Sequence, residues 1–597
     1  MCGIAGLVGK TDLTIEKMSD CIAHRGPDGF GYWRQSLGQV ALAHRRLSIL
    51  DPESGQQPMV SQDGLRAITF NGEIYNFHEL RDELQRQGCV FKTQCDTEVV
   101  LVGYGIYGAR ILEKLRGMFA FGIWDSEKEI LFLARDRLGI KPLFYKLFPE
   151  GLAFASETKA LCSQHNELNT QSFIDYLRLG FRTSNETLLK GIHELPPAAS
   201  AIYRYDAGPE IKINEYWHLP DPAEVSGDLT SNAEHLAQEL EYTSKSHLLS
   251  DVPLGFWLSG GLDSSIILSC AKDAISEDSR SAFTLAYGLP NDETPYAQAM
   301  AEAAGVNWHL FKADLRQLKE SIVDMVWYLE EPLPNVSALT TFLLAQKTRP
   351  FTKVVLIGEG SDELFGGYPH YVPFTGWWQI LPSNLRSWAN ERAFLMPSMS
   401  HWSKLVGSEI RKQIKAEKHQ VPVLATLDEA LRFDVRHELV QNQLARIDRL
   451  TMAHGIEARV PFLDHHVVET AMRIPDKQKR QDNRTKIVLR RAFEKALPLE
   501  IINRPKYGQK GTQRISEMLY NLVIQPLAQN ILTPERLLTI GFDPAAIDRF
   551  MHERKWSYYH RAVLHKTVYF ILLFEIWHRL FIEGETRENV KASLHLA

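Results

Sequence analysis

The stretch VPLGFWLSGGLDSS (residues 252–265) decides the fold of the larger part of this chain. Its apolar run is followed by two glycines, Gly260 and Gly261, and then by the helical run SIILSCAKDAI. A strand that turns through glycines into a helix points free backbone N–H groups and the helix dipole at one place, which favours an anion there. A second stretch of the same design, KVVLIGEGSDELFGG (353–367), follows later. Strands that alternate with helices in this way predict an α/β domain with a parallel sheet.

The glycine turn carries the side chains of a phosphate site. The hydroxyl groups of Ser259, Ser264 and Ser265 can donate to phosphate oxygens. Asp263 would repel a bare phosphate, so its presence predicts Mg²⁺ between the carboxylate and the phosphates. Asp362 in the second stretch is a candidate second ligand, with an ordinary acidic surface turn as the alternative. No lysine follows the glycines, so the loop differs from the common nucleoside-triphosphate P-loop.

The first part of the chain has a different pattern. Short β-type runs broken by glycine, such as GMFAFGIWD and GLAFASE, predict layered antiparallel β-sheets with a few helices. One helix is expected in NFHELRDELQRQG (76–88). Residues 206–232 are rich in Pro, Gly, Asp and Ser and are the expected linker. We therefore expect a first domain at 1–205 and a second at 233–597.

Composition limits the classes of function. A chain of 597 residues is too long for a single core, and 44% apolar with 23% charged residues is ordinary for a folded protein. The net charge of −6 gives no general attraction to nucleic acid or to an anionic membrane, so neither is expected as a partner. Six cysteines without paired spacing argue against a disulfide framework and a zinc site, and favour a reducing compartment.

The N-terminus lacks the pattern of a secretory signal, so we expect a cytoplasmic protein. The apolar stretch VYFILLFEIWHRLFI (568–582) is short for a membrane span and predicts a buried helix. The tryptophans of the stretch 370–440 are expected in the core. They are Trp377, Trp378, Trp388 and Trp402.

Eight motifs resemble those of the glutamine-dependent asparagine synthetases, in the same order over roughly residues 1–515. They are MCGIAG (1–6), HRGPDGFG (24–31), HRRLSILD (44–51), FNGEIYNF (70–77), LSGGLDSS (258–265), GEGSDELFGGY (358–368), DRLTMAHGIEARVPFLDH (448–465) and TKIVLRRAF (485–493). The resemblance implies an N-terminal nucleophile glutaminase domain joined to an ATP-pyrophosphatase synthetase domain.

For the first domain, the resemblance implies that Cys2 attacks the side-chain amide of glutamine. Removal of Met1 would expose the α-amine of Cys2, which could then accept the thiol proton as general base. The side chain of Asn71 and the N–H of Gly72 would stabilise the oxyanion. Arg46 would bind the α-carboxylate and Asp96 the α-amine of glutamine. The full glutamine site implied by the family is Arg46, Leu47, Ser48, Ile49, Leu50, Asn71, Gly72, Glu73 and Asp96.

For the second domain, the resemblance implies that a carboxylic acid attacks the α-phosphorus of ATP, giving an acyl-adenylate and pyrophosphate. Lys486 would neutralise charge on the phosphates, and Glu359 would assist the attack of ammonia. An internal tunnel near GIEARVPFLD (455–464) would carry the ammonia. Asp263 and Asp362 are the expected Mg²⁺ ligands. The ATP contacts implied by the family are Trp257, Ser259, Gly260, Gly261, Asp263, Ser264, Leu285, Ile357 and Gly358.

The acceptor acid is less well defined, because NRPKYGQKGT (503–512) departs from the family pattern, with Gln509 where an aromatic residue is common. Aspartate is the favoured acceptor. Another carboxylate of a natural-product or surface-polymer pathway is one alternative, and a catalytically silent regulatory relative is another. The small-molecule substrates are therefore glutamine, ATP and an acid, and a homodimer stays an open alternative.

Overall fold

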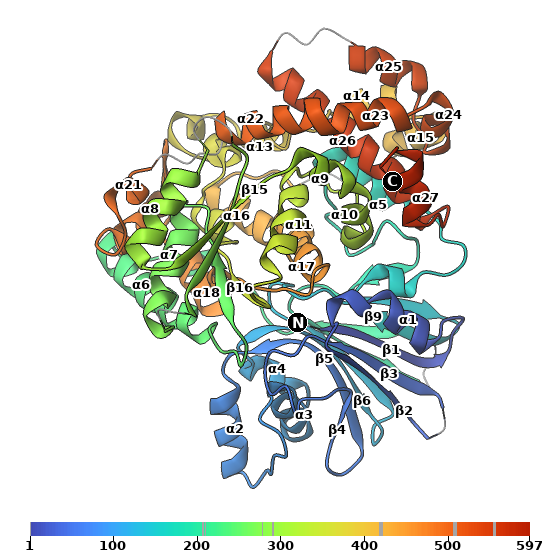
Figure 1. Ribbon diagram of the computed structural model, residues 1–597, viewed down its shortest axis with the longest axis vertical. Coiled ribbons are helices and arrows are strands. Elements are labelled where there is room, and N and C mark those ends of the chain that lie inside the picture. The colour runs from blue at the N-terminus through green and yellow to red at the C-terminus, as the bar shows by residue number, and fades with distance from the viewer. Residues whose placement is uncertain are drawn as a thin grey trace.

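The computed structural model of the protein describes residues 2–596, apart from 37, 206–207, 209, 277–278, 289–291, 417–421, 505–509 and 553–556. Figure 1 shows a lower part made of β-sheets, an α/β part beside it and a helical part at the top. Gln509, the residue at which the sequence departs from the family pattern, lies outside the described residues, as does Met1.

Two antiparallel sheets form the first domain, as the sequence predicts. The first has the strand order β10 (Ile192–Glu194), β8 (Phe144–Phe148), β9 (Glu150–Ala155), β1 (Gly3–Lys10), β3 (Val40–Arg46) and β2 (Gly29–Arg34). The second has the order β12 (Ile211–Glu215), β11 (Ala199–Arg204), β7 (Ile130–Arg135), β6 (Gly117–Asp125), β5 (Arg66–Ile74) and β4 (Met59–Val60). Because β12 pairs with β11, part of the expected linker contributes a strand to this sheet.

The two sheets pack face to face through apolar side chains, and the central strands β6 and β7 are buried along almost their whole length. Ile4 and Leu42 of the first sheet share one core cluster with Ala120 and Leu133 of the second. The outer face of the second sheet is covered by α2 (Phe77–Arg86) and α3 (Asp96–Tyr107). The helix predicted at 76–88 is therefore confirmed as α2.

The second domain is built on a five-stranded sheet. Its order is β15 (Asn307–Lys312), β14 (Ser281–Ala286), β13 (Leu254–Trp257), β16 (Val354–Leu356) and β17 (Glu457–Arg459), and all of its pairs are parallel. Figure 1 shows α6 (Leu229–Ser246), α7 (Leu262–Ala271) and α8 (Thr294–Ala304) on one side of the sheet, with α11 (Ser337–Thr348) and α17 (Ala445–Met452) on the other. The α/β prediction is confirmed.

The remaining described helices surround this sheet or form the helical part, except the first two named below, which pack in the first domain. They are α1 (Ile15–Cys21), α4 (Ile111–Lys114), α5 (Thr170–Leu179), α9 (Leu315–Glu320), α10 (Ile322–Leu329), α12 (Ser361–Phe365), α13 (Ser383–Ala393), α14 (Met399–Leu405), α15 (Ser408–Ala416), α16 (Leu427–Arg436), α18 (His465–Arg473), α19 (Asp476–Lys479), α20 (Ile487–Phe493), α21 (Leu499–Ile502), α22 (Lys510–Leu519), α23 (Gln525–Ile531), α24 (Pro534–Thr539), α25 (Pro544–His552), α26 (Tyr558–Phe581) and α27 (Arg587–Ser593).

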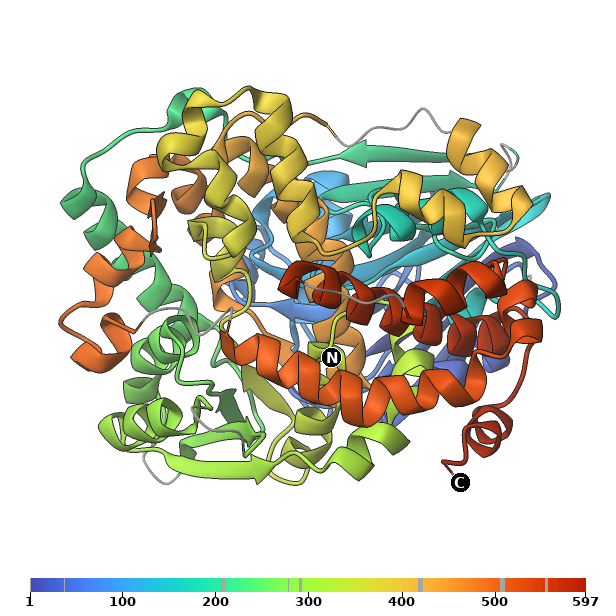
Figure 2. The ribbon, with the colours of Figure 1, turned by 90° about the horizontal axis from the view of Figure 1, so that it is seen from above.

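The predicted buried helix at 568–582 is the second half of α26, which packs beside α23 as Figure 2 shows. Trp402 is completely buried against Phe570 of this helix. The expectation that all four tryptophans of 370–440 lie in the core is wrong, because Trp377 is 64% exposed and Trp388 is 55% exposed. Within the described part of the chain, no helix is both long and apolar enough to span a membrane.

Candidate functional site

Cys2 lies directly before β1, at the edge of the first domain that faces the second. Its backbone N–H donates to Oδ1 of Asn71 at 2.9 Å, and Nε of Arg25 donates to its carbonyl oxygen at 3.0 Å. Cys2 is only 9% exposed. Two hydrogen bonds therefore fix the backbone of Cys2 in an enclosed site.

Burial raises the pKa of the Cys2 thiol, and the charge of Glu457 raises it further, while the N–H of Leu47 and the charge of Arg46 oppose the rise. The thiol is therefore protonated at neutral pH in this setting. Since the thiolate is the nucleophile, the site needs a base beside the sulfur. This requirement agrees with the predicted use of the α-amine of Cys2 itself.

Asn71 and Gly72 lie next to each other on β5, which places them opposite Cys2. Asn71 is completely buried, and its Nδ2 has no hydrogen-bond partner within the described residues, while its Oδ1 holds Cys2. A buried donor without a partner is costly unless a ligand fills the place. A side chain at Gly72 would lie 2.2 Å from the carbonyl oxygen of Met118, so only glycine fits there.

The residues expected to bind glutamine lie around this point. Arg46 ends β3, and its guanidinium donates to the carbonyl oxygens of Pro52 at 2.9 Å and Leu50 at 3.2 Å. These bonds hold the turn at residues 50–52, and the N–H of Leu47 contacts the Cys2 thiol. Asp96 begins α3, accepts a hydrogen bond from the N–H of Ile74 at 3.0 Å and is buried. Burial raises the pKa of Asp96 to about 6.

Glu73 has a second role that the sequence does not reveal. Its Oε2 accepts from Nη2 of Arg459 at 2.9 Å, and Arg459 also pairs with Glu457 at 2.6 Å. Both partners lie on β17 of the second domain. The other oxygen, Oε1, has no hydrogen-bond partner in the described part of the chain. Glu73 therefore links the first site to the second domain through a buried ion pair.

The glycine turn of 258–265 adopts the predicted strand–turn–helix geometry between β13 and α7. The N–H of Ser259 donates to Oγ of Ser264 at 3.2 Å, and the N–H of Gly261 donates to Oγ of Ser259 at 3.2 Å. Gly260 has a φ of +69°, and a side chain there would lie 2.3 Å from the backbone nitrogen of Ala297. The turn is therefore compact and presents its serine hydroxyls at the start of α7.

Lys486 joins the two acidic loops. Its Nζ donates to Oδ1 and to Oδ2 of Asp263 at 2.7 Å each and lies 2.6 Å from Oδ1 of Asp362. Although burial lowers the pKa of Lys486, the two carboxylates raise it above its ordinary value. Ser361 adds a donor to Asp263 at 2.8 Å. Two carboxylates thus converge on one cation, at the place where the sequence predicts Mg²⁺ and phosphate.

Glu359 pairs with Arg446 of α17, whose Nη2 lies 2.9 Å from Oε1 of the carboxylate. Arg446 also donates to Thr341 at 2.6 Å. The sequence analysis missed Arg446, because it lies far along the chain from Glu359 and inside a helix. The one feature of the sequence that could have indicated a role for Arg446 is its position just before the motif DRLTMAHGIEARVPFLDH.

A cavity of about 400 Å³ brings the second set of predicted residues together. Its lining includes the predicted residues Trp257, Ser259, Asp263, Ser264, Leu285, Ile357, Gly358, Glu359 and Asp362. Gly260, Gly261 and Lys486 are not part of this lining, although Lys486 contacts Asp263 and Asp362, which are. A side chain at Gly358 would lie 2.8 Å from the backbone of Asp263, so the two loops touch.

Helix α17 connects the two sites directly. Arg446 reaches Glu359 in the cavity, whereas Asp448 accepts from Nη2 of Arg25 at 2.9 Å. Arg25 in turn holds the carbonyl oxygen of Cys2. Lys141 lies 3.4 Å from the other oxygen of Asp448. Both sites therefore contact one short stretch of α17.

Cys2 lies beside the amide nitrogen of Asn71, which is unpartnered within the described residues, and one helix joins this site to the cavity lined by the glycine turn. This arrangement is the one expected of a glutamine amidotransferase with a synthetase site. Residues 1–217 match the glutamine amidotransferase domain family, and residues 235–579 match the asparagine synthase family. The chain therefore belongs to the glutamine-hydrolysing asparagine synthetase family. It is an enzyme of glutamine-dependent, ATP-driven amidation.

Similar proteins span almost the same length. Asparagine synthetase [glutamine-hydrolyzing] 1 of Bacillus subtilis (strain 168) is 30% identical, over 98% of this chain and 97% of the relative. A putative asparagine synthetase [glutamine-hydrolyzing] of Mycobacterium tuberculosis (strain ATCC 25618 / H37Rv) is 32% identical, over 97% and 96%. Amidase chry2 of Gibberella zeae (strain ATCC MYA-4620 / CBS 123657 / FGSC 9075 / NRRL 31084 / PH-1) is 28% identical, over 86% and 89%.

Proposed function

We propose that the protein converts aspartate to asparagine, with glutamine as nitrogen donor and ATP as the source of energy. The contact of α17 with both sites carries this proposal, since Arg446 meets Glu359 and Asp448 meets Arg25. Ammonia released at Cys2 would pass along this helix to the acid activated in the cavity.

At the first site, the thiol of Cys2 attacks the amide carbon of glutamine. The α-amine of Cys2, exposed once Met1 is removed, takes the thiol proton and returns it to the leaving ammonia. The free Nδ2 of Asn71 donates to the oxyanion, as does the N–H of Gly72. Water then cleaves the thioester to release glutamate.

At the second site, the phosphates of ATP lie over the glycine turn and the start of α7. Asp263 and Asp362 would hold Mg²⁺, since carboxylate and hydroxyl oxygens are the ligands it prefers. Bound Mg²⁺ neutralises charge on the phosphates. Within the described residues no group of three or more His, Cys, Asp or Glu side chains forms a complete metal site, so the phosphates would supply further ligands.

Glu359 lies at the end of the cavity closest to α17 and is held by Arg446. This position suits a carboxylate that accepts a proton from ammonia as it attacks the acyl-adenylate. Lys486 orients both aspartates and adds positive charge near the leaving pyrophosphate. Glu359 and Lys486 thereby act on the same acyl-adenylate step.

The test is a reaction of the purified enzyme with amide-¹⁵N glutamine, Mg-ATP and aspartate. We expect ¹⁵N-asparagine, glutamate, AMP and pyrophosphate in equal amounts. The variant Cys2→Ala should lose glutamine-dependent synthesis by at least ~10³-fold and keep synthesis from ammonium. AMP formation without asparagine would overturn the assignment of aspartate.

A different acceptor acid is the second candidate. It is favoured by the similarity to a protein named an amidase rather than an asparagine synthetase. A screen of carboxylic acids, read out by glutamine-dependent pyrophosphate release, distinguishes aspartate from another acceptor. Rescue of an asparagine auxotroph by this gene would exclude the second candidate.

A further inference from the structure

Arg504 reaches the glycine turn from outside the eight motifs. It follows α21 and lies at the start of the stretch 503–512, which departs from the family pattern. Figure 1 shows α21 beside α8, and both helices contact α7, which begins directly after the glycine turn. The roles given above to other residues leave Arg504 unassigned.

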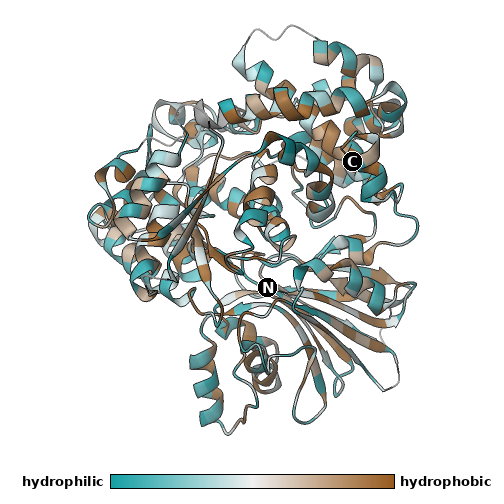
Figure 3. Ribbon diagram, in the orientation of Figure 1, coloured by the Kyte–Doolittle hydropathy of each residue, from teal (hydrophilic) through white to brown (hydrophobic). Residues whose placement is uncertain are grey.

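The surroundings of Arg504 are partly apolar. Figure 3 shows both apolar and polar residues on these helices. Arg504 itself is 8% exposed. A buried guanidinium is costly unless acceptors surround it and fix its position. The contacts of Arg504 therefore define a specific arrangement.

Three contacts fix the guanidinium group of Arg504. Nη1 donates to the carbonyl oxygen of Gly260 at 2.8 Å, and Nη2 lies 2.8 Å from Oε1 of Glu293. The guanidinium carbon lies 4.1 Å from the centre of the Tyr296 ring, which is a cation–π distance. Glu293 also lines the nucleotide cavity, the cavity of about 400 Å³ described above. Arg504 thus joins the glycine turn to the start of α8.

The backbone of Arg504 is held by α20. Nη2 of Arg490 donates to the carbonyl oxygen of Arg504 at 3.3 Å, and Nη1 of Arg490 donates to the carbonyl oxygen of Ile502. Arg490 lies one helical turn after Lys486. The segment that carries Arg504 is therefore anchored to the helix that Lys486 precedes.

The peptide group between Gly260 and Gly261 connects Arg504 to the nucleotide cavity. A peptide group is planar and trans, so its C=O and its N–H point in opposite directions. Arg504 holds the C=O, while the N–H of Gly261 donates to Oγ of Ser259 at 3.2 Å. Ser259 lines the nucleotide cavity, and its hydroxyl can donate to a phosphate oxygen while it accepts from Gly261. The orientation of one peptide group therefore sets the position of a phosphate donor.

We propose that Arg504 is a positioning residue for ATP: by holding the peptide group of the glycine turn, it keeps the hydroxyl of Ser259 in place for the pyrophosphate part of the nucleotide. The proposal rests on the proposed place of the ATP phosphates over the glycine turn. The ion pair with Glu293 adds a smaller effect, because it neutralises a carboxylate on the cavity wall that would repel the phosphates.

The experiment is isothermal titration calorimetry of the full-length enzyme with Mg-pyrophosphate and, separately, with adenosine, which carries no phosphate. We expect Arg504→Met to raise the Kd of Mg-pyrophosphate about tenfold and to leave the Kd of adenosine unchanged. Arg504→Lys keeps the charge but loses the planar fork of donors, so it should raise the Kd of Mg-pyrophosphate about threefold. If Arg504→Lys binds Mg-pyrophosphate as tightly as the wild type, charge alone suffices and the positioning role is wrong.

A double variant tests the route through the peptide group. Ser259→Ala removes the hydroxyl that Arg504 is proposed to place. Adding Arg504→Met to Ser259→Ala should therefore raise the Kd of Mg-pyrophosphate by less than about twofold more. If the effects of the two single variants multiply instead, Arg504 acts independently of Ser259, for example through the charge of Glu293, and the proposal is overturned.

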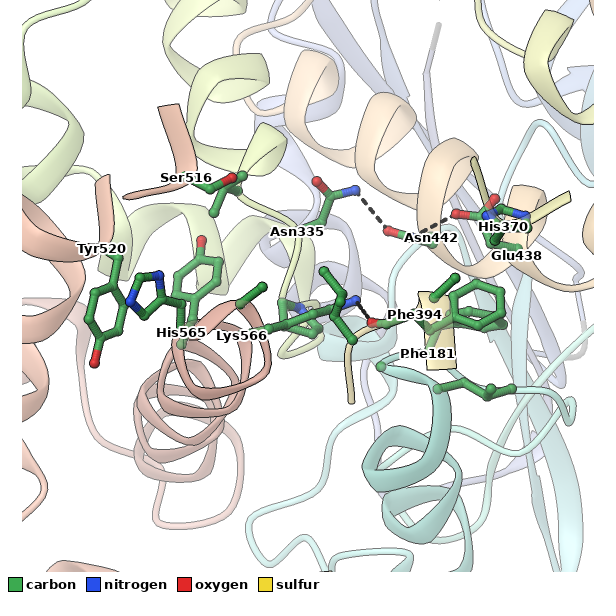
Figure 4. A pocket seen from close by; sticks show the side chains of 18 of the residues that line it. Phe181, Asn335, His370, Phe394, Glu438, Asn442, Ser516, Tyr520, His565 and Lys566 are labelled. Atoms are coloured by element: carbon green, nitrogen blue, oxygen red, sulfur yellow. Dashed lines mark hydrogen bonds between the residues drawn. The ribbon is translucent and has the colours of Figure 1, made fainter. Parts of the chain in front are cut away.

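Two matched variants serve as controls. Arg432 pairs with Asp428 at 2.6 Å and donates to the carbonyl oxygen of Pro220 at 2.6 Å, which are the same kinds of contact as those of Arg504. In a second cavity, of about 370 Å³, Lys566 donates to the carbonyl oxygen of Phe394 at 2.7 Å, as Figure 4 shows. Both residues lie outside the lining of the nucleotide cavity. Arg432→Met and Lys566→Met should leave both Kd values unchanged, whatever they do to the unfolding temperature.

The results separate this proposal from the placement of the phosphates on which it rests. If the wild type binds Mg-pyrophosphate and Arg504→Met binds it equally well, the role of Arg504 is wrong while the nucleotide site stands. If the wild type binds adenosine but not Mg-pyrophosphate, the phosphates do not lie over the glycine turn, and the proposal falls with that placement.

Discussion

At the scale of the residue, Asn71 has two ends with different tasks. Its Oδ1 holds the backbone N–H of Cys2, and its Nδ2 is left without a partner in the described part of the chain. A donor that is already oriented before the reaction stabilises the oxyanion at little further cost. We therefore propose that Asn71 gives the first domain an oxyanion site that is oriented before the reaction.

We expect Asn71→Ala to lower the glutaminase kcat by about 10²–10³-fold, since one oxyanion donor contributes that much in comparable sites. The KM for glutamine should change far less. The neighbouring Asn76→Ala, which removes hydrogen bonds to Lys114 and Arg116, is the matched control. An equal loss of ammonium-dependent synthesis would show a general folding defect and contradict the assigned role.

The raised pKa of Asp96 leads us to expect that glutamine binding depends on pH. Burial raises its pKa to about 6, so the carboxylate becomes neutral as the pH falls through that value. The ammonium group of glutamine then loses its anionic partner. We expect the KM for glutamine to rise about tenfold per pH unit below ~6.

Steady-state kinetics between about pH 5 and pH 8 measure this dependence. In Asp96→Asn, the KM should be high throughout and should lose the inflection near pH 6. If the wild type and the variant show the same inflection, another group controls binding and the assignment of Asp96 is wrong.

At the scale of the element, Lys486 fixes three helices with one side chain. It precedes α20 and contacts Asp263 of α7 and Asp362 of α12. Without it, two carboxylates would face each other across the cavity edge, which is unfavourable without a cation. The geometry of both acidic loops therefore depends on α20.

We expect Lys486→Met to reduce pyrophosphate release by at least ~10²-fold while glutaminase activity persists. Mg²⁺ should raise the unfolding temperature of this variant more than that of the wild type, because a divalent cation can replace the lost charge. Differential scanning calorimetry with and without Mg²⁺ tests this. An equal Mg²⁺ effect on both proteins would argue against Asp263 and Asp362 as metal ligands.

Local elements could be predicted from the sequence, whereas contacts between distant helices could not. The strand–turn–helix at 252–271 could be predicted because its glycines, strand and helix are adjacent in the chain. The place of Arg446 beside Glu359 could not, because it depends on how separate helices pack. The exposure of Trp377 could not be predicted either, because an apolar side chain does not by itself specify a buried position.

At the scale of the whole molecule, the two domains meet through buried ion pairs of two kinds. Asp448 with Arg25 lies beside Cys2, whereas Arg116 with Asp464, at 2.7 Å, contacts neither described site. Both pairs join the domains, but only the first lies on the connection made by α17. Variants of the two ion pairs therefore show whether the Asp448–Arg25 pair acts on ammonia transfer or only holds the two domains together.

We expect Asp448→Asn to release more glutamate than amide product, because a loosened contact beside Cys2 lets ammonia escape to solvent. The ratio should rise from near one to at least about two, and the free energy of unfolding should fall by about 1–3 kcal/mol, the cost of weakening a buried hydrogen-bonded group. The control Arg116→Gln should lose a similar amount of stability and keep the ratio near one. Product ratios from amide-¹⁵N glutamine, with unlabelled ammonium as competitor, measure the escape directly. If both variants raise the ratio of glutamate to amide product equally, retention of ammonia depends on domain contact in general. If neither variant raises it, ammonia does not pass along α17.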